Sequence, residues 1–123
     1  MASSVLSDIQ TALEELGVPV YYGAADTLST DEVWDYAVFF RRNLSPTGGK
    51  TGIAQTYEVA LVFEEYVPDE KVWACVDAMT ALPGFRLADT GGEYQYTKKP
   101  STEQVIEILT LDFVRPLRRC SDG

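Results

Sequence analysis

The sequence contains no histidine and only two cysteines, Cys75 and Cys120. The absence of histidine removes the commonest general base, the commonest nitrogen ligand for soft metals and every catalytic triad that depends on an imidazole. Two cysteines form neither a disulfide scaffold nor a four-ligand zinc site. We therefore expect no enzymatic activity, no metal and no cofactor, and we interpret the two cysteines as a buried thiol and a thiol in the C-terminal tail.

Basic residues are also scarce, because 10 lysines and arginines face 19 acidic residues, which gives a net charge of -9. This charge disfavours nonspecific attraction to the phosphates of nucleic acids, although it would suit a surface past which DNA must slide without sticking. The chain has no apolar run long enough to span a membrane and no N-terminal signal peptide. We expect a protein that is cytosolic at synthesis.

Two helices are predicted from apolar residues at helical spacing. The first covers residues 5–16 and ends before Gly17, a residue type that commonly follows a helix. The second lies between Pro68 and the Pro83-Gly84 pair, which suit a helix start and a helix stop. Trp73 falls among the apolar residues of the second helix. We expect it to be the large side chain that packs this helix against a sheet.

Strand patterns fill most of the remaining chain. Alternation in 33–42 and 57–64 predicts a long antiparallel hairpin, with the connecting loop within 43–55. A short edge strand is predicted at 18–23 and a strand central to the sheet at 102–114, whereas 85–97 is either a tight hairpin or one bulged strand. Residues 1–123 therefore form one α+β domain, with two helices on one face of a mainly antiparallel sheet and a long protruding hairpin.

Three motifs suggest chemistry without supporting it. Gly49-Lys50-Thr51 imitates the end of a phosphate-binding loop, but Leu44 stands where that motif needs glycine, and a strand follows instead of a helix. Asp26, Asp31 and Glu32 lack the spacing of a calcium loop and fit a solvated turn. Glu107 lies on an otherwise apolar strand face, so it sits at a sheet margin or a subunit contact, and we expect it to be exposed to solvent.

Three passages together resemble a known family. They are Gly17-Val18-Pro19-Val20-Tyr21-Tyr22-Gly23, then Glu65-Tyr66-Val67-Pro68, and then Pro83-Gly84-Phe85-Arg86-Leu87-Ala88 through Glu93-Tyr94-Gln95-Tyr96 to Val105-Ile106-Glu107-Ile108-Leu109. They look like the tail terminator, or tail completion, proteins of long-tailed bacteriophages and prophages. The similarity is made of strand patterns and turns spread over nearly the whole chain.

The resemblance implies a structural virion protein of the tail and neck. Such a subunit assembles in the host cytoplasm, usually as a hexameric ring on the last ring of the tail tube, where it stops tube growth and joins the tail to the head. The implied partners are further copies of the chain, the tail tube protein and a head-tail connector or stopper protein. Genomic DNA would pass through the lumen without specific binding, and no membrane is involved.

Within this interpretation two segments are candidate assembly contacts. The hairpin loop would order on a neighbouring ring, and a basic tail at 115–123 would pair with acidic groups of the next subunit. The candidate interface residues are Ser45, Thr47, Lys50, Thr51, Ile53, Glu107, Arg115, Arg118 and Arg119. Two alternatives stay open: a head-tail connector or stopper protein of the neck, and a small-ligand-binding module or small enzyme on an α+β scaffold.

Overall fold

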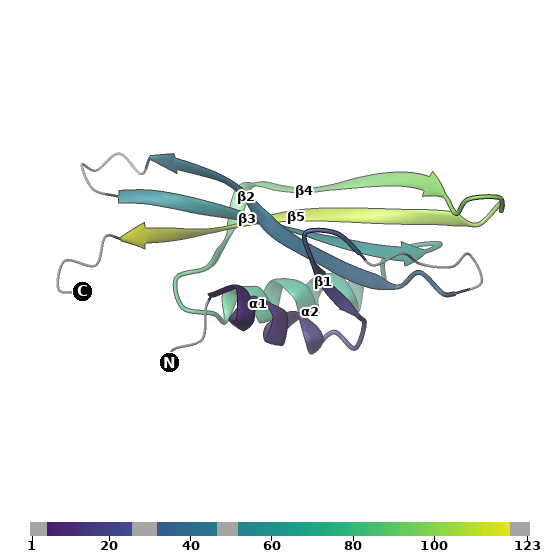
Figure 1. Ribbon diagram of the computed structural model, residues 1–123, viewed down its shortest axis with the longest axis horizontal. Coiled ribbons are helices and arrows are strands. Elements are labelled where there is room, and N and C mark those ends of the chain that lie inside the picture. Colours follow the sequence, from purple (N-terminus) through teal and green to yellow (C-terminus); the bar gives the residue numbers. More distant parts are fainter. Residues whose placement is uncertain (1–4, 26–31, 47–51, 119–123) are drawn as a thin grey trace.

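The computed structural model describes residues 5–25, 32–46 and 52–118. In this part of the chain two helices and five strands follow one another in the order α1 (Val5–Glu14), β1 (Val20–Tyr22), β2 (Tyr36–Pro46), β3 (Gly52–Glu64), α2 (Asp69–Thr80), β4 (Arg86–Lys98) and β5 (Val105–Arg118). The strands form one sheet in the order β1-β2-β3-β5-β4. Figure 1 shows both helices on the same face of this sheet.

The sheet is mixed, because β1 pairs in parallel with β2 while the other three pairings are antiparallel. The prediction of an α+β domain with helices on one face of a mainly antiparallel sheet is confirmed. β5 lies between β3 and β4, which confirms the prediction that this strand is central to the sheet. β1 lies at an edge, which agrees with the preceding Pro19, a residue that cannot donate to a neighbouring strand.

The core lies between the sheet and the helices. The alternating residues predicted for β3, from Tyr57 to Phe63, all point into it and are buried. Leu109, Leu111 and Phe113 continue the same face on β5, and α1 and α2 close it. The helical side chains in this core are Ile9, Leu13, Cys75 and Met79, and Leu16 joins them from the turn after α1.

α1 ends at Glu14, two residues before the predicted bound, and α2 ends at Thr80, before the Pro83-Gly84 pair. The chain leaves α1 through Gly17, whose φ of +81° is accessible to glycine at little cost. Pro68 stands at the N-cap of α2 and has an extended backbone. The prediction for Trp73 is wrong, because its side chain is 66% exposed, while Cys75, the expected buried thiol, faces the core.

Two predicted boundaries change, and one open alternative is decided. β2 runs to Pro46 and β3 begins at Gly52, so most of the predicted loop 43–55 is paired strand. β5 continues along β3 as far as the pair of Gly52 with Arg118, so residues 115–118 belong to a strand and not to a tail. Residues 86–98 form one strand with a register shift between Leu87 and Gly92, which decides for the bulged strand over the tight hairpin.

Candidate assembly interface

Two of the predicted contact residues, Ser45 and Ile53, lie at the end of the β2–β3 hairpin. Ser45 is exposed at the end of β2, and Ile53 is 40% exposed on β3 opposite Pro46. Leu44 is exposed as well, and its partner Gln55 places it on the face of the sheet that carries the helices. In Figure 1 the helices do not reach this end of the sheet, and Leu44 and Ile53 are 56% and 40% exposed there. Thr47, Lys50, Thr51 and Arg119 lie outside the described residues.

The predicted residues of β5 do not gather at one place. Arg115 is half-buried, and its guanidinium carbon lies 5.9 Å from the centre of the Phe85 ring, within the range of a cation–π contact. Arg118 pairs through its backbone with Gly52 at the hairpin end. Glu107 lies eight residues before Arg115 and eleven before Arg118 on the strand, so the structure does not bring it together with the others.

The expectation that Glu107 is exposed is wrong. Only 8% of this residue is accessible, and its Oε1 accepts a hydrogen bond of 2.7 Å from the backbone N–H of Val67. The carboxylate thereby satisfies a buried donor in the segment between β3 and α2. The adjacent Tyr96 hydrogen-bonds to the same carboxylate, which raises the pKa of the tyrosine. Glu107 therefore stabilises the segment between β3 and α2 of its own subunit.

Both edges of the sheet are open over part of their length in the described chain. β4 forms the outer edge from Arg86 to Lys98 and pairs only with β5. At the other side β1 covers β2 only from Ala37 to Phe39, which leaves the edge from Phe40 to Pro46 without a neighbouring strand. An open edge presents unpaired N–H and C=O groups and can take up a strand of another chain.

A polar cluster on the face opposite the helices connects the irregular parts of β2 and β4. Arg42, at the register shift of β2, donates through Nη1 to Oδ2 of Asp112 on β5, and Glu58 of β3 lies beside both. Thr90, in the bulge of β4, makes a longer contact of 3.4 Å to the same Asp112 oxygen. Burial and the neighbouring Asp112 raise the pKa of Glu58, against the opposite effect of Arg42.

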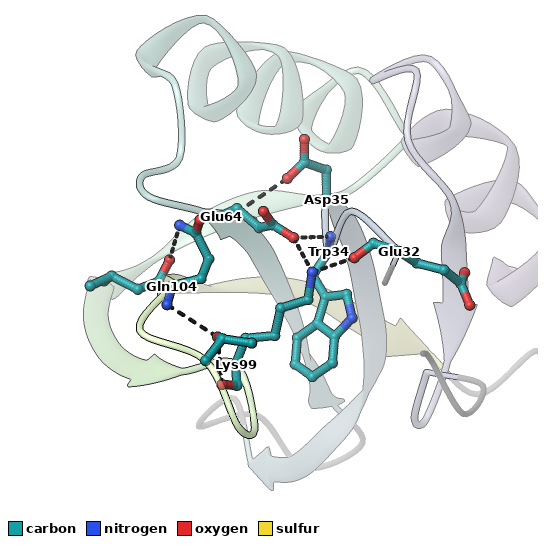
Figure 2. A network of polar contacts seen from close by, with 8 residues as sticks. Glu32, Trp34, Asp35, Glu64, Lys99 and Gln104 are labelled. Carbon is teal, nitrogen blue, oxygen red and sulfur yellow. Dashed lines mark hydrogen bonds and ion pairs between the residues drawn. The ribbon is translucent and has the colours of Figure 1, made fainter. Parts of the chain in front are cut away.

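A second polar network lies at the other end of the same face (Figure 2). Lys99, only 6% exposed, donates through Nζ to Oε2 of Glu64 at 2.6 Å and to the backbone carbonyl of Glu32. The same Glu64 oxygen accepts a bond of 2.9 Å from the backbone N–H of Trp34, and the Glu64 N–H donates to Asp35. The contacts with Lys99 and with the Trp34 N–H lower the pKa of Glu64, Lys99 contributing most. The network fixes the segment that enters β2.

Neither network has the arrangement of a metal centre. In residues 5–25, 32–46 and 52–118 no three cysteine, aspartate or glutamate side chains group as a metal ion would require. The Asp112 cluster lines a hollow of about 420 Å³, but the guanidinium of Arg42 already neutralises much of its acidic wall. Sequence reasoning did not identify Lys99 or Asp112. The signal for Asp112 was an acid midway along β5, after a first half in which Glu107 is the one other charged residue.

The arrangement defines a small α+β domain with open sheet edges and an apolar hairpin end. Compared with known proteins, the chain matches no family model, and no curated protein matches it significantly. Among the described helices none is long and apolar enough to cross a membrane.

Proposed function

We propose that this chain is a structural subunit that forms a ring, and that the ring is a phage tail terminator. It would cap the tail tube, end tube polymerisation and provide the surface for head-tail joining. The sequence resemblance supplies the particular role. The support for ring assembly comes from the sheet, whose two open edges have different sequences and lengths.

The strand directions carry the proposal. From β2 through β3 and β5 to β4 each strand runs opposite to its neighbour. A second copy in the same orientation would place its β2 next to β4 of the first, and these two strands are again antiparallel. Because the two edges are different surfaces, this contact is heterologous, and repeated copies close into a ring or continue as a filament.

The composition supports a ring around DNA. A net charge of -9 keeps the surface from holding the phosphate backbone, which a passage for DNA requires. The exposed Leu44 and Ile53 at the hairpin end offer apolar surface for a neighbouring ring, and Ser45 lies beside them. These residues would contact the tube protein or the head-tail connector.

Light scattering after size exclusion, with negative-stain electron microscopy, tests the ring. We expect a species about six times heavier than the 13.6 kDa chain, alone or on addition of tail tubes. A protein that stays monomeric at high concentration and does not bind tube ends contradicts the proposal. Rings that bind the head connector but leave tube length unchanged would identify a stopper instead.

Proline substitutions at Gln95 and Tyr96 test the edge contact directly. Adjacent strand residues point their N–H groups to opposite sides, so one proline removes a bond to β5 and the other removes a donor only from the open edge. The variant whose monomer is as stable as the wild type has lost only the donor on the open edge, so it is the one that tests the edge contact. It should lose the ring, whereas a ring that persists excludes β4 from the contact.

A further inference from the structure

Trp73 is the largest side chain of α2, and it points away from the core. Two thirds of its surface is accessible, although tryptophan is among the residues that gain most from burial. The inward face of the helix is filled by Cys75 and Met79, so Trp73 does not stabilise the packing of α2 on the sheet. An exposed tryptophan without a packing role is typical of a residue that anchors a partner.

Carboxylates surround this tryptophan on the helix surface. Asp69 and Glu70 precede it by four and three residues, and Asp77 follows it by four, the spacings at which helical side chains are neighbours. All three are exposed, and no salt bridge is formed by any of them in the described chain. An indole ring and three unpaired acids therefore form one face, which we call the Trp73 face.

We propose that the Trp73 face docks an arginine-bearing segment of another protein. A guanidinium stacks on the indole ring and at the same time donates to a neighbouring carboxylate, a geometry for which its planar fork is suited. The acids exclude phosphate-rich partners such as nucleic acid by repulsion. This inference does not depend on the proposed ring, because α2 belongs to neither sheet edge.

A second copy of the chain is a poor source of this arginine. Most cationic side chains that the structure describes already contact groups of their own subunit: Arg42, Lys71, Arg86, Lys98, Lys99 and Arg115. The chain as a whole also carries nearly twice as many acids as bases. Docking of a copy would therefore bring like charges together, whereas a basic partner of different sequence gains from the same field.

The test uses a fluorescein-labelled peptide of alternating arginine and glycine, titrated with the full chain at physiological salt and followed by anisotropy. Trp73→Ala should weaken binding about three- to tenfold, the range of a partly desolvated cation–π contact, and Trp73→Phe less. The lysine counterpart of the peptide should bind more weakly than the arginine peptide. Circular dichroism confirms that each variant is folded.

Matched charge variants separate a site from a general field. The triple variant Asp69→Asn, Glu70→Gln, Asp77→Asn removes three charges from the Trp73 face, and the control removes three exposed charges elsewhere through Glu14→Gln, Glu15→Gln and Glu93→Gln. We expect the first to weaken binding at least threefold more than the second. Equal losses, equal binding of the two peptides, or a Trp73→Ala variant that changes only self-association would overturn the proposal.

Discussion

Lys98 and Lys99 each form an ion pair with a glutamate, and one pair is exposed whereas the other is buried. Lys98 bonds Glu103 at 2.7 Å with its side chain 57% exposed, and Lys99 bonds Glu64 at 2.6 Å with its side chain 7% exposed. The distances are nearly equal, so the two pairs differ mainly in burial. Replacement of each lysine by methionine keeps most of the aliphatic stem and removes the charge.

The buried pair of Lys99 and Glu64 should contribute far more to the free energy of unfolding than the exposed pair of Lys98 and Glu103. Lys99→Met removes the donor to Glu64 and to the Glu32 carbonyl, and it leaves a carboxylate with only partial access to water. Loss of one partner of a fully buried pair costs about 3–5 kcal/mol, and the partial exposure of Glu64 reduces this to about 2–3 kcal/mol. Lys98→Met should cost about 0.5 kcal/mol or less, because an exposed pair is screened by solvent.

Urea denaturation of the two variants measures the free energy of unfolding. Glu64→Gln combined with Lys99→Met should recover about 1 kcal/mol relative to Lys99→Met alone, since the amide oxygen still accepts from the Trp34 N–H but carries no charge. If Lys99→Met costs no more than Lys98→Met, burial does not control the strength of this pair, and the account of the network fails.

The same network predicts a pH dependence. The pKa of Glu64 lies below its ordinary value because Lys99 and the Trp34 N–H stabilise the carboxylate. Its contribution to stability is therefore complete above the unfolded pKa and is lost as the pH falls through the lower folded value. Unfolding midpoints measured downward from pH 6 should decline less steeply for Glu64→Gln than for the wild type.

Three further predictions concern single positions. Gly92→Ala should cost about 1–3 kcal/mol in urea denaturation, because a Cβ there would lie 2.6 Å from a side-chain carbon of Leu111; an unchanged midpoint would contradict the close packing of β4 on β5. Glu107→Ala should cost about 1–3 kcal/mol, since the N–H of Val67 loses its acceptor, and rapid loss of amide protection at Val67 would locate the effect. Burial raises the pKa of Cys75 to about 12, so a disulfide reagent should modify this thiol in the folded chain only at the rate of unfolding.

The sequence patterns predicted which side chains of β3 and β5 face the core. When one face of a sheet is buried, only one register of an alternating strand places its apolar side chains on that face. On β3 and β5 a shift by one residue would expose Tyr57 and Phe113. The bounds of the hairpin loop were wrong for a physical reason. Polar and glycine-rich residues from Asn43 to Gly52 resemble a loop, but Asn43 to Pro46 pair with β3, and β5 pairs with the other side of the same stretch of β3.

The prediction for Trp73 failed through helix geometry. Trp73 is two residues from Cys75, which places it about 200° around the helix axis at 100° per residue. The size and apolarity of Trp73 suggested that it lies in the core, but its position on the helix places it on the side away from the core. The same kind of limit applies to the candidate site, since Arg42 and Asp112 are 70 residues apart, and no local pattern reveals such a contact.

The Lys99 network also explains why the start of β5 is apolar on both faces. Ile106 and Val62 point away from the helices, yet they are only 1% and 6% exposed. Ile106 lies opposite Glu64, to which the amine of Lys99 reaches, and that amine sits 5.4 Å from the centre of the Trp34 ring. The stem of Lys99 and the segment before β2 therefore cover a small second core. Farther along, the face carries Thr110 and Asp112, and there the side chains of Arg42 and Thr90 contact the Asp112 carboxylate, which leaves Asp112 only 7% exposed.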